Sequence, residues 1–350
     1  MHPAGATTLI TRLLFTPTRT TAITDLEKQE PAWVPKRGSR LRALNILSLM
    51  LRDPRFGSKV LDKHEYAAML ESHGEVINKY GELWDCQIES QEDLEERVEE
   101  LIWAATLMYG VGSWDGNEVE YRADFFTYVQ SRMYVLAYLT VLLSAHIVTS
   151  VLFIPPICAY LSRPSQTTLL RAHFLTSITW WLVRGRPGFA LKGLTSQPLA
   201  PLPNVPSSKY SNSFPGSQPT PSACALPSPA SPFANNPNPW YPILADALVH
   251  PNEHLCKVQR AMAHFNVLYG HREAGFVLDS LSKDGVEVDP EYAYLDGSVF
   301  LRVAWLTGAA LGWVSRGEDD SGVWNYREFQ RAAQEELELL RNNPGQGRAL

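Results

Sequence analysis

Residues 195–239 contain twelve prolines and nine serines in 45 positions, and Lys209 is the only charged residue among them. Proline removes a backbone hydrogen-bond donor and breaks helices, and a stretch this poor in large apolar side chains cannot build a core. We therefore expect a disordered or polyproline-like linker. The fold has to be built by the residues on either side of it.

The periodic segments on both sides of the linker are helical. In one of them Ser90 is a candidate N-cap, Asp93 follows three residues later, apolar residues recur at helical spacing, and Gly110 is expected to end the helix. Residues 297–313 and 326–343 show the same spacing. Because no run of alternating β-branched residues indicates a sheet, we predict an all-α fold.

These patterns predict one helical domain interrupted by the linker. The N-terminal stretch has no acidic residue before Asp25 and carries Arg12 and Arg19 among many threonines. It is interpreted as a disordered leader, with a transit peptide as the alternative. The expected division is a leader at 1–38, a first helical part at 39–194, the linker at 195–239 and a second helical part of the same domain at 240–345.

Charge and cysteine usage exclude several classes. The net charge is −6 and no basic stripe is present, so nucleic acid is not an expected partner. The four cysteines are far apart and form no CxxC pair, which argues against a zinc knuckle or a disulfide framework. A reducing, cytoplasmic location is the expectation.

Residues 133–153 form an uncharged run of 21 residues, a length that spans a bilayer. His146 lies within this run, and an imidazole in the middle of a membrane helix is costly. A transmembrane helix and an insertion foreign to the domain are both considered, and the insertion is preferred.

Residues 250–271 hold four of the nine histidines. Pro251 suits the first helical position, so a helix is expected to begin there with His250 just outside it. At about 100° per residue, His254 and Lys257 share one edge of the buried face with the later histidines. Such an edge either bridges core and solvent or holds a metal, and the segment lacks the Glu of H-E-x-x-H.

Several blocks of the sequence resemble, in order, those of the questin oxidase-like family, over roughly residues 40–330. They are "ADFF" (123–126), "HIVTSVLFIPP" (146–156), "LLRAH" to "WWLVRGRP" (169–187), "NPWYPILADALVHPNEHLCK" (238–257), "YGHREAG" (269–275), "LDGSVFLRVAWLTGAALGW" (295–313) and "WNYREF" (324–329). The resemblance implies a fungal oxidoreductase of secondary metabolism. It implies Baeyer–Villiger-type ring opening of an anthraquinone-like polyketide with O₂ and, formally, NADPH.

The sequence offers no dinucleotide motif for such a reaction. The glycine cluster at 110–116 follows a helix rather than a strand and misses the GxGxxG spacing. An O₂-using protein without such a domain needs another means of handling oxygen, and imidazole-ligated non-haem Fe(II) provides one.

The resulting hypothesis for the site combines distant parts of the chain. Its nitrogen ligands are His146, His250 and His254, with Lys257 as a carbamate ligand or a group behind the ligands. Lys257 and Asp124 are the expected catalytic residues. Four tryptophans are expected either to wall a pocket for a flat substrate or to be ordinary core residues: Trp180, Trp181, Trp305 and Trp313.

Two departures from the family pattern leave a second hypothesis open. Family members carry a histidine-bearing helical segment before the equivalent of residue 40, where this chain has the Thr-rich leader. Residues 127–145 separate "ADFF" from the "HIVTS" block and resemble a translated intron. The alternative to an enzyme is an inactive truncated relic or a membrane-tethered helical interaction protein.

Overall fold

The computed structural model describes residues 41–56, 65–112, 147–196, 238–283 and 285–316. This described part is 72% helical and contains no strand, which confirms the predicted all-α class. Leu41 and Trp84 form an isolated parallel bridge that joins the start of the described chain to the end of a helix.

The helices divide into those before and those after the linker. Before it lie α2 (Ala43–Arg52), α3 (Glu65–Leu83), α4 (Gln91–Thr106), the π-helical η1 (Leu107–Val111), α7 (Ile147–Val151), α8 (Ile154–Cys158), α9 (Arg163–Val183) and α10 (Leu191–Ser196). After it lie α12 (Trp240–Val249), α13 (Glu253–Tyr269), α14 (Leu278–Leu281), η3 (Pro290–Tyr294), α15 (Ser298–Leu311) and η4 (Val314–Arg316).

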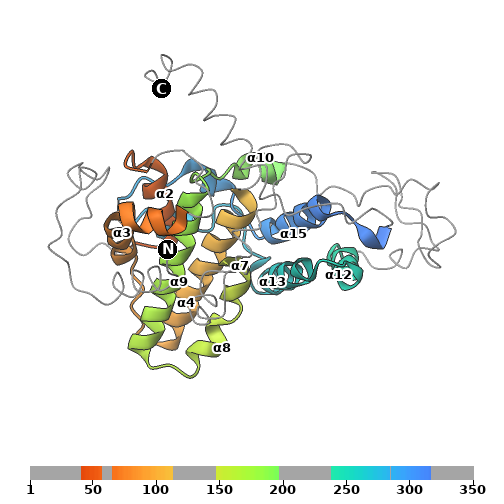
Figure 1. Ribbon diagram of the computed structural model, residues 1–350, viewed down its shortest axis with the longest axis horizontal. Helices are drawn as coiled ribbons and strands as arrows, with labels where there is room; N and C mark the ends of the chain where they lie inside the picture. Colours follow the sequence, from red (N-terminus) through yellow and green to blue (C-terminus); the bar gives the residue numbers. More distant parts are fainter. Residues whose placement is uncertain (1–40, 57–64, 113–146, 197–237, 284, 317–350) are drawn as a thin grey trace, which may run out of the picture.

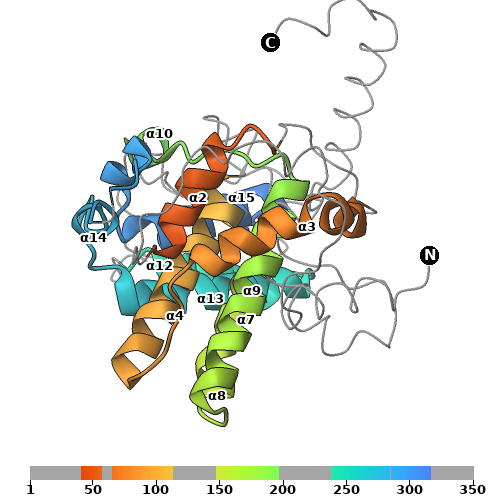
Figure 2. The same cartoon turned by 90° about the vertical axis from the view of Figure 1, so that its left-hand side faces the viewer.

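The two groups of helices share one hydrophobic cluster. α4 packs against α2, α7 and α9, while α13 packs against α12, α15 and α7 (Figures 1 and 2). Trp103 on α4 and Phe300 on α15 lie with ring centroids 4.6 Å apart, and both are buried. Helix α7 therefore lies between the first bundle and the second group of helices.

Helix α4 begins as the sequence predicts. The Ser90 hydroxyl accepts the backbone N–H of Asp93 at 3.1 Å, and the Asp93 carboxylate accepts the N–H of Ser90 at 2.8 Å. This reciprocal pair is a capping box, and it satisfies two of the backbone donors that a helix start leaves unpaired.

The end of α4 differs from the prediction that Gly110 terminates it. The chain continues through the π-helical turn η1 to Val111, and Gly112 still has right-handed helical backbone angles. A Cβ on Gly110 would lie 2.2 Å from a methyl carbon of Val303, on α15. Gly110 thus permits a close approach of two elements, and the contact lies far outside any local sequence window.

Helix α13 begins two residues later than expected. Asn252 is the N-cap, with its side-chain oxygen 3.0 Å from the backbone N–H of His254, so Pro251 precedes the helix. An Asn side chain satisfies a helix start directly, which the fixed φ of proline does not do. Farther along, the buried Gln259 donates to the Ala304 carbonyl of α15 at 2.8 Å.

A buried ionic network fixes the loops after α2 and α9. Asp53 accepts from Arg55 at 2.5 Å and from the Tyr80 hydroxyl at 2.6 Å. Arg186, with φ 54°, donates to the Asp53 carbonyl at 2.7 Å. The left-handed backbone at Arg186 is uncommon for a residue with a Cβ, and these contacts hold it in place.

Several expectations fall outside the described residues. They concern the leader at 1–38, the insertion at 127–145, nearly all of the linker at 195–239 and the helix at 326–343. Of the apolar run 133–153, only the part from Ile147 onward is described, and it contains the five-residue α7. Within the described ranges, no helix has both the length and the apolar character needed to cross a bilayer.

Candidate functional site

His250 lies at the end of α12, where both of its ring nitrogens face backbone groups. Nδ1 accepts the N–H of Asn252 at 3.0 Å, and Nε2 lies 3.3 Å from the Leu311 carbonyl oxygen at the end of α15. Since Nδ1 is the acceptor, Nε2 carries the proton and donates it to that carbonyl. In this arrangement the buried imidazole ties two helix ends together. To bind an ion, the ring would first have to give up one of these bonds.

His254 and Lys257 lie on the first two turns of α13. His254 Nδ1 is 3.2 Å from the side-chain oxygen of Asn252, and its Nε2 lies 3.7 Å from the Glu253 carboxylate. Lys257 Nζ lies 3.3 Å from the Glu253 carboxylate, and this pairing lowers the pKa of Glu253. The structure therefore shows Lys257 as the cation of an exposed ion pair.

The rest of the hypothetical iron site cannot be placed. His146 and Asp124 lie outside the described residues. Among the residues that are described, no three His, Cys, Asp or Glu side chains form a group that could hold a metal ion. Convergence of His146 with His254 stays a prediction. His250 does not fit the role of a ligand as it lies, because both of its ring nitrogens are hydrogen-bonded.

The four tryptophans expected near a substrate pocket belong to the core or its edge. Trp180, Trp181 and Trp313 are fully buried, and Trp305 packs against the same cluster. Trp180 stacks on Tyr66 with ring centroids 4.5 Å apart. None of the four lines the cavity between α4 and residues 272–281, which is described below. Their packing matches the alternative that they are ordinary core residues.

A buried histidine that the sequence interpretation passed over lies between α7 and α9. His173 is 1% exposed, and its Nε2 lies 2.8 Å from the Ser150 hydroxyl. Among the residues that the structure describes, its Nδ1 has no hydrogen-bond partner. Buried ring nitrogens without a partner are rare in folded proteins, and they mark strain, catalysis or a bound ion or water. A single His within the apolar stretch 172–183 was the available signal in the sequence.

His173 is held as a neutral base. Burial lowers its pKa to about 4, because the charged imidazolium would lose its hydration there. Ser150 belongs to the "HIVTS" block and His173 to the "LLRAH" block, so two of the quoted blocks meet at this contact. The contact thus supplies a water-poor environment with one unpartnered imidazole nitrogen.

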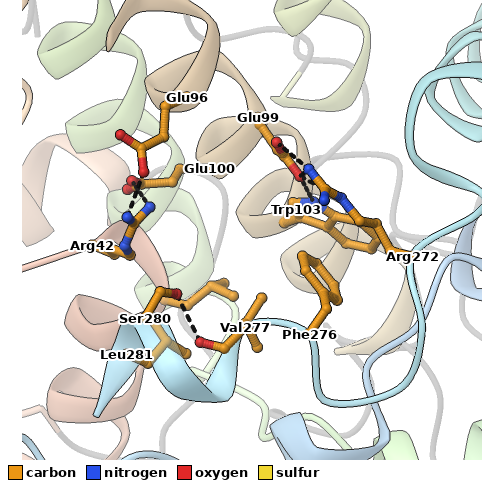
Figure 3. Close-up of a pocket in the computed structure, with 11 residues that line it drawn as sticks. Arg42, Glu96, Glu99, Glu100, Trp103, Arg272, Phe276, Val277, Ser280 and Leu281 are labelled. Carbon is orange, nitrogen blue, oxygen red and sulfur yellow. Dashed lines mark hydrogen bonds and ion pairs between the residues drawn. The ribbon is translucent and has the colours of Figure 1, made fainter. Parts of the chain in front are cut away.

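A cavity of about 210 Å³ opens between α4 and residues 272–281 (Figure 3). Arg42, Glu96 and Glu100 form one wall, while Glu99, Trp103, Arg272 and Phe276 form the other; Leu44, Val277, Ser280 and Leu281 complete the lining. Pockets that enclose drug-sized ligands measure roughly 300–1,000 Å³. The cavity is therefore too small to enclose a three-ring polyketide.

The charges around this cavity are paired within its walls. Glu100 accepts from the Ala43 N–H and from Trp84 Nε1, both at 2.8 Å, and from Arg97 at 2.6 Å. Burial raises the pKa of Glu100, and these donors oppose that rise. On the opposite wall the Arg272 guanidinium makes two bonds to Glu99, at 3.2 and 3.0 Å. This cluster accordingly holds α4 to its neighbours.

Comparison with known proteins decides the family. The family model described as questin oxidase-like matches residues 13–262, which is more than half of the chain. The chain belongs to the questin oxidase-like family. The match begins closer to the N-terminus than the blocks quoted from residue 40 onward, and it includes both His173 and the start of α13. No curated protein matches the chain.

Membership of the questin oxidase-like family indicates an oxidoreductase. The match ends at residue 262, so α14 and α15 lie beyond it although they pack into the same core. The contact between Ser150 and His173 lies inside the matched region. The further details of reaction and substrate belong to the proposal that follows.

Proposed function

We propose that the protein is an oxidoreductase that opens a ring of an anthraquinone-like polyketide with O₂. The family match over residues 13–262 carries this proposal. In a Baeyer–Villiger step one oxygen atom of O₂ enters between the carbonyl carbon and its ring neighbour. The second oxygen atom leaves as water, for which NADPH supplies two electrons as hydride and solvent supplies a proton. Hydrolysis of the resulting lactone by a second water molecule then opens the ring.

The chemistry of the described side chains is compatible with iron, although they do not form a complete ligand set. His173, whose Nδ1 has no hydrogen-bond partner among the described residues, and His254 carry imidazole nitrogens of the kind that Fe(II) takes. Iron, when bound, would supply O₂ activation. His146, Lys257 and Asp124 complete the proposal as a further nitrogen ligand, a carbamate ligand and an acid–base group.

The residues of the chain would contribute chiefly by position and by exclusion of water. Asn252 orients the ring of His254, and Ser150 orients the ring of His173. Because His173 is buried and neutral at physiological pH, it can accept a proton or donate a lone pair without first losing one. The electron source is proposed to be NADPH, used directly or through a reductase.

Oxygen consumption tests the proposal directly. The purified protein is loaded with Fe(II) under argon and given questin or another hydroxylated anthraquinone. An oxygen electrode then follows the reaction with and without NADPH. We expect substrate-dependent O₂ uptake and, by mass spectrometry, a product that has gained one oxygen atom as the lactone or one oxygen atom and one water molecule as the opened ring. A folded, iron-loaded protein that consumes no O₂ with any such quinone would exclude this function and leave the inactive relic.

Matched variants test whether His173 and His254 take part in the reaction or only support the fold. His173→Ala and His254→Ala should each lower the rate at least roughly a hundredfold, as expected for loss of a group at the reacting centre. His264→Ala, on the exposed side of α13, is the control and should retain the rate. If all three variants keep wild-type activity while folded, the two imidazoles are not part of the site.

A further inference from the structure

Helix α12 is apolar on its outer face as well as on its inner face. Tyr241, Leu244 and Leu248 follow one another at spacings of three and four residues, and they are 45%, 37% and 81% exposed. On the inner face Ile243 and Ala247 are buried. Helices that are apolar all round are normally covered on all sides. The outer face of α12 therefore has the character of a surface that receives another element.

The described chain ends beside this helix. The 3-10 turn η4 packs against α12, and the backbone N–H of Ser315 donates to Asp246 at 2.7 Å. Asp246 lies within α12 and is fully buried, so this bond fixes the exit of the chain at α12. After Arg316 another 34 residues follow, at 317–350.

The sequence after this exit contains a segment of matching character. At 326–343, Phe329, Ala333, Leu337 and Leu340 recur at spacings of three and four residues, as on one face of a helix. Arg331, Glu335 and Glu338 fall on the opposite face, where Arg331 and Glu335 are spaced as an i,i+4 pair. The segment would thus have one apolar and one charged face.

The connecting chain is long enough for residues 326–343 to reach α12. The nine residues 317–325 span up to roughly 30 Å when extended, whereas the ten residues of α12 extend about 15 Å. The connection is thus long enough to lay the segment along α12 and short enough to keep its local concentration high. Neither a partner protein nor a second copy has this advantage.

We propose that residues 326–343 dock as an amphipathic helix on the outer face of α12. Phe329, Leu337 and Leu340 cover Tyr241, Leu244 and Leu248. The contact closes the second group of helices from outside and does not depend on the proposed oxidation. Its role is to stabilise α12, whose C-terminal end continues into His250 and the start of α13.

Hydrogen exchange of α12 measures this docking. In the full chain carrying Leu337→Asp and Leu340→Asp, the amides of 240–249 should exchange roughly tenfold faster than in the wild type. The matched control, Glu335→Gln on the charged face, should leave the exchange unchanged. Equal exchange in all three proteins would overturn the proposal.

A synthetic peptide of residues 326–343 provides a second measurement. It should bind a chain that ends at Arg316 and restore the slow exchange of α12. Leu248→Asp in that chain should abolish binding, whereas Tyr160→Ser, on the loop after α8, should not. If the shortened chain does not fold, the same pair of substitutions is compared by exchange in the full chain.

Light scattering tests whether a second copy of the chain, rather than residues 326–343, covers the outer face of α12. The full chain should be monomeric or should keep its oligomeric state when Leu248 is changed to Asp. A dimer of the full chain that Leu248→Asp converts to a monomer would show that a second copy covers α12. That result would overturn docking of residues 326–343.

Discussion

The Ser150 hydroxyl and Nε2 of His173 lie 2.8 Å apart in the contact between α7 and α9. The imidazole is buried, and its other nitrogen has no hydrogen-bond partner within the described ranges. These two residues come from separate blocks of the family pattern, so the fold brings together what the sequence separates by 23 positions. The contact has measurable consequences for stability as well as for chemistry.

The acid stability of the protein should depend on His173. Its folded pKa is about 4, whereas the unfolded chain has the ordinary value near 6.5. Between these pH values only the unfolded state binds the proton, so stability falls as the pH is lowered through this window. By pH 4 the loss is about 3 kcal/mol. Urea unfolding at pH 7, 6, 5 and 4.5 measures it.

A pair of variants isolates this effect from that of other groups. His173→Gln should remove about 3 kcal/mol of the pH dependence of unfolding, whatever its stability at pH 7. His264→Gln, at an exposed position on α13, should leave the pH dependence as in the wild type. The same slope in both variants would contradict a buried neutral imidazole at 173.

The closeness of Gly110 and Val303 predicts a specific pairwise effect. Gly110→Ala places a methyl group 2.2 Å from a Val303 methyl carbon and should destabilise the protein by about 1–3 kcal/mol. In the Val303→Ala background the same change should cost much less, because the clashing methyls are gone. Thermal unfolding of the two single variants and the double variant gives the coupling energy. Additive effects would show that the helices do not approach so closely.

Removal of the charge at Glu100 should be strongly destabilising. Glu100→Gln leaves the buried Arg97 with only the more exposed Glu96 as a charged partner and puts an amide donor where acceptors are needed, at a cost of roughly 3–5 kcal/mol. Glu95→Gln, exposed on the same helix, should change stability by less than about 0.5 kcal/mol. Urea unfolding at pH 7 compares them, and similar values for the two would refute the network's role.

The Asp53 network should also lose stabilising free energy as the pH falls. Burial alone raises the pKa of Asp53, but bonds from Arg55 and Tyr80 outweigh it, so the folded pKa lies below the ordinary value. The network therefore stabilises fully at neutral pH and weakens as the pH falls through that lowered pKa.

Substitution separates the two partners of Asp53. Asp53→Asn should cost roughly 3 kcal/mol at pH 7 because Arg55 stays buried without its counter-charge. Tyr80→Phe should cost only about 1 kcal/mol, since the Arg55 pair remains. Denaturant unfolding ranks them, and a larger loss for Tyr80→Phe would contradict the dominance of the ion pair.

Local features of the fold were predictable and long-range ones were not. The capping box of Ser90 and Asp93 and the helix at 297–313 depend on neighbours within a few residues, and both are present. The extension of α4 through a π-turn depends on Gly110 meeting Val303, almost 200 positions away. No local pattern contains that contact.

The same reason explains why the sequence pointed to the histidines of residues 250–271 and not to the buried His173. The histidines of residues 250–271 attracted attention because they are close in sequence, yet His250 turns out to pair with the end of α15. His173 stands alone in an apolar stretch, and only the fold shows that Ser150 faces it. The spacing of residues in the sequence shows which side chains share one face of a helix. A site, however, is built from side chains on several helices.

The close packing of α13 on α15 limits how this protein can be dissected. The family match stops at residue 262, inside α13, although Phe265 is still fully buried and Gln259 is bonded to α15. An expression fragment cut at that limit would divide a helix and strip its partner away. Gene fusions and deletion series should therefore retain the chain at least to Arg316.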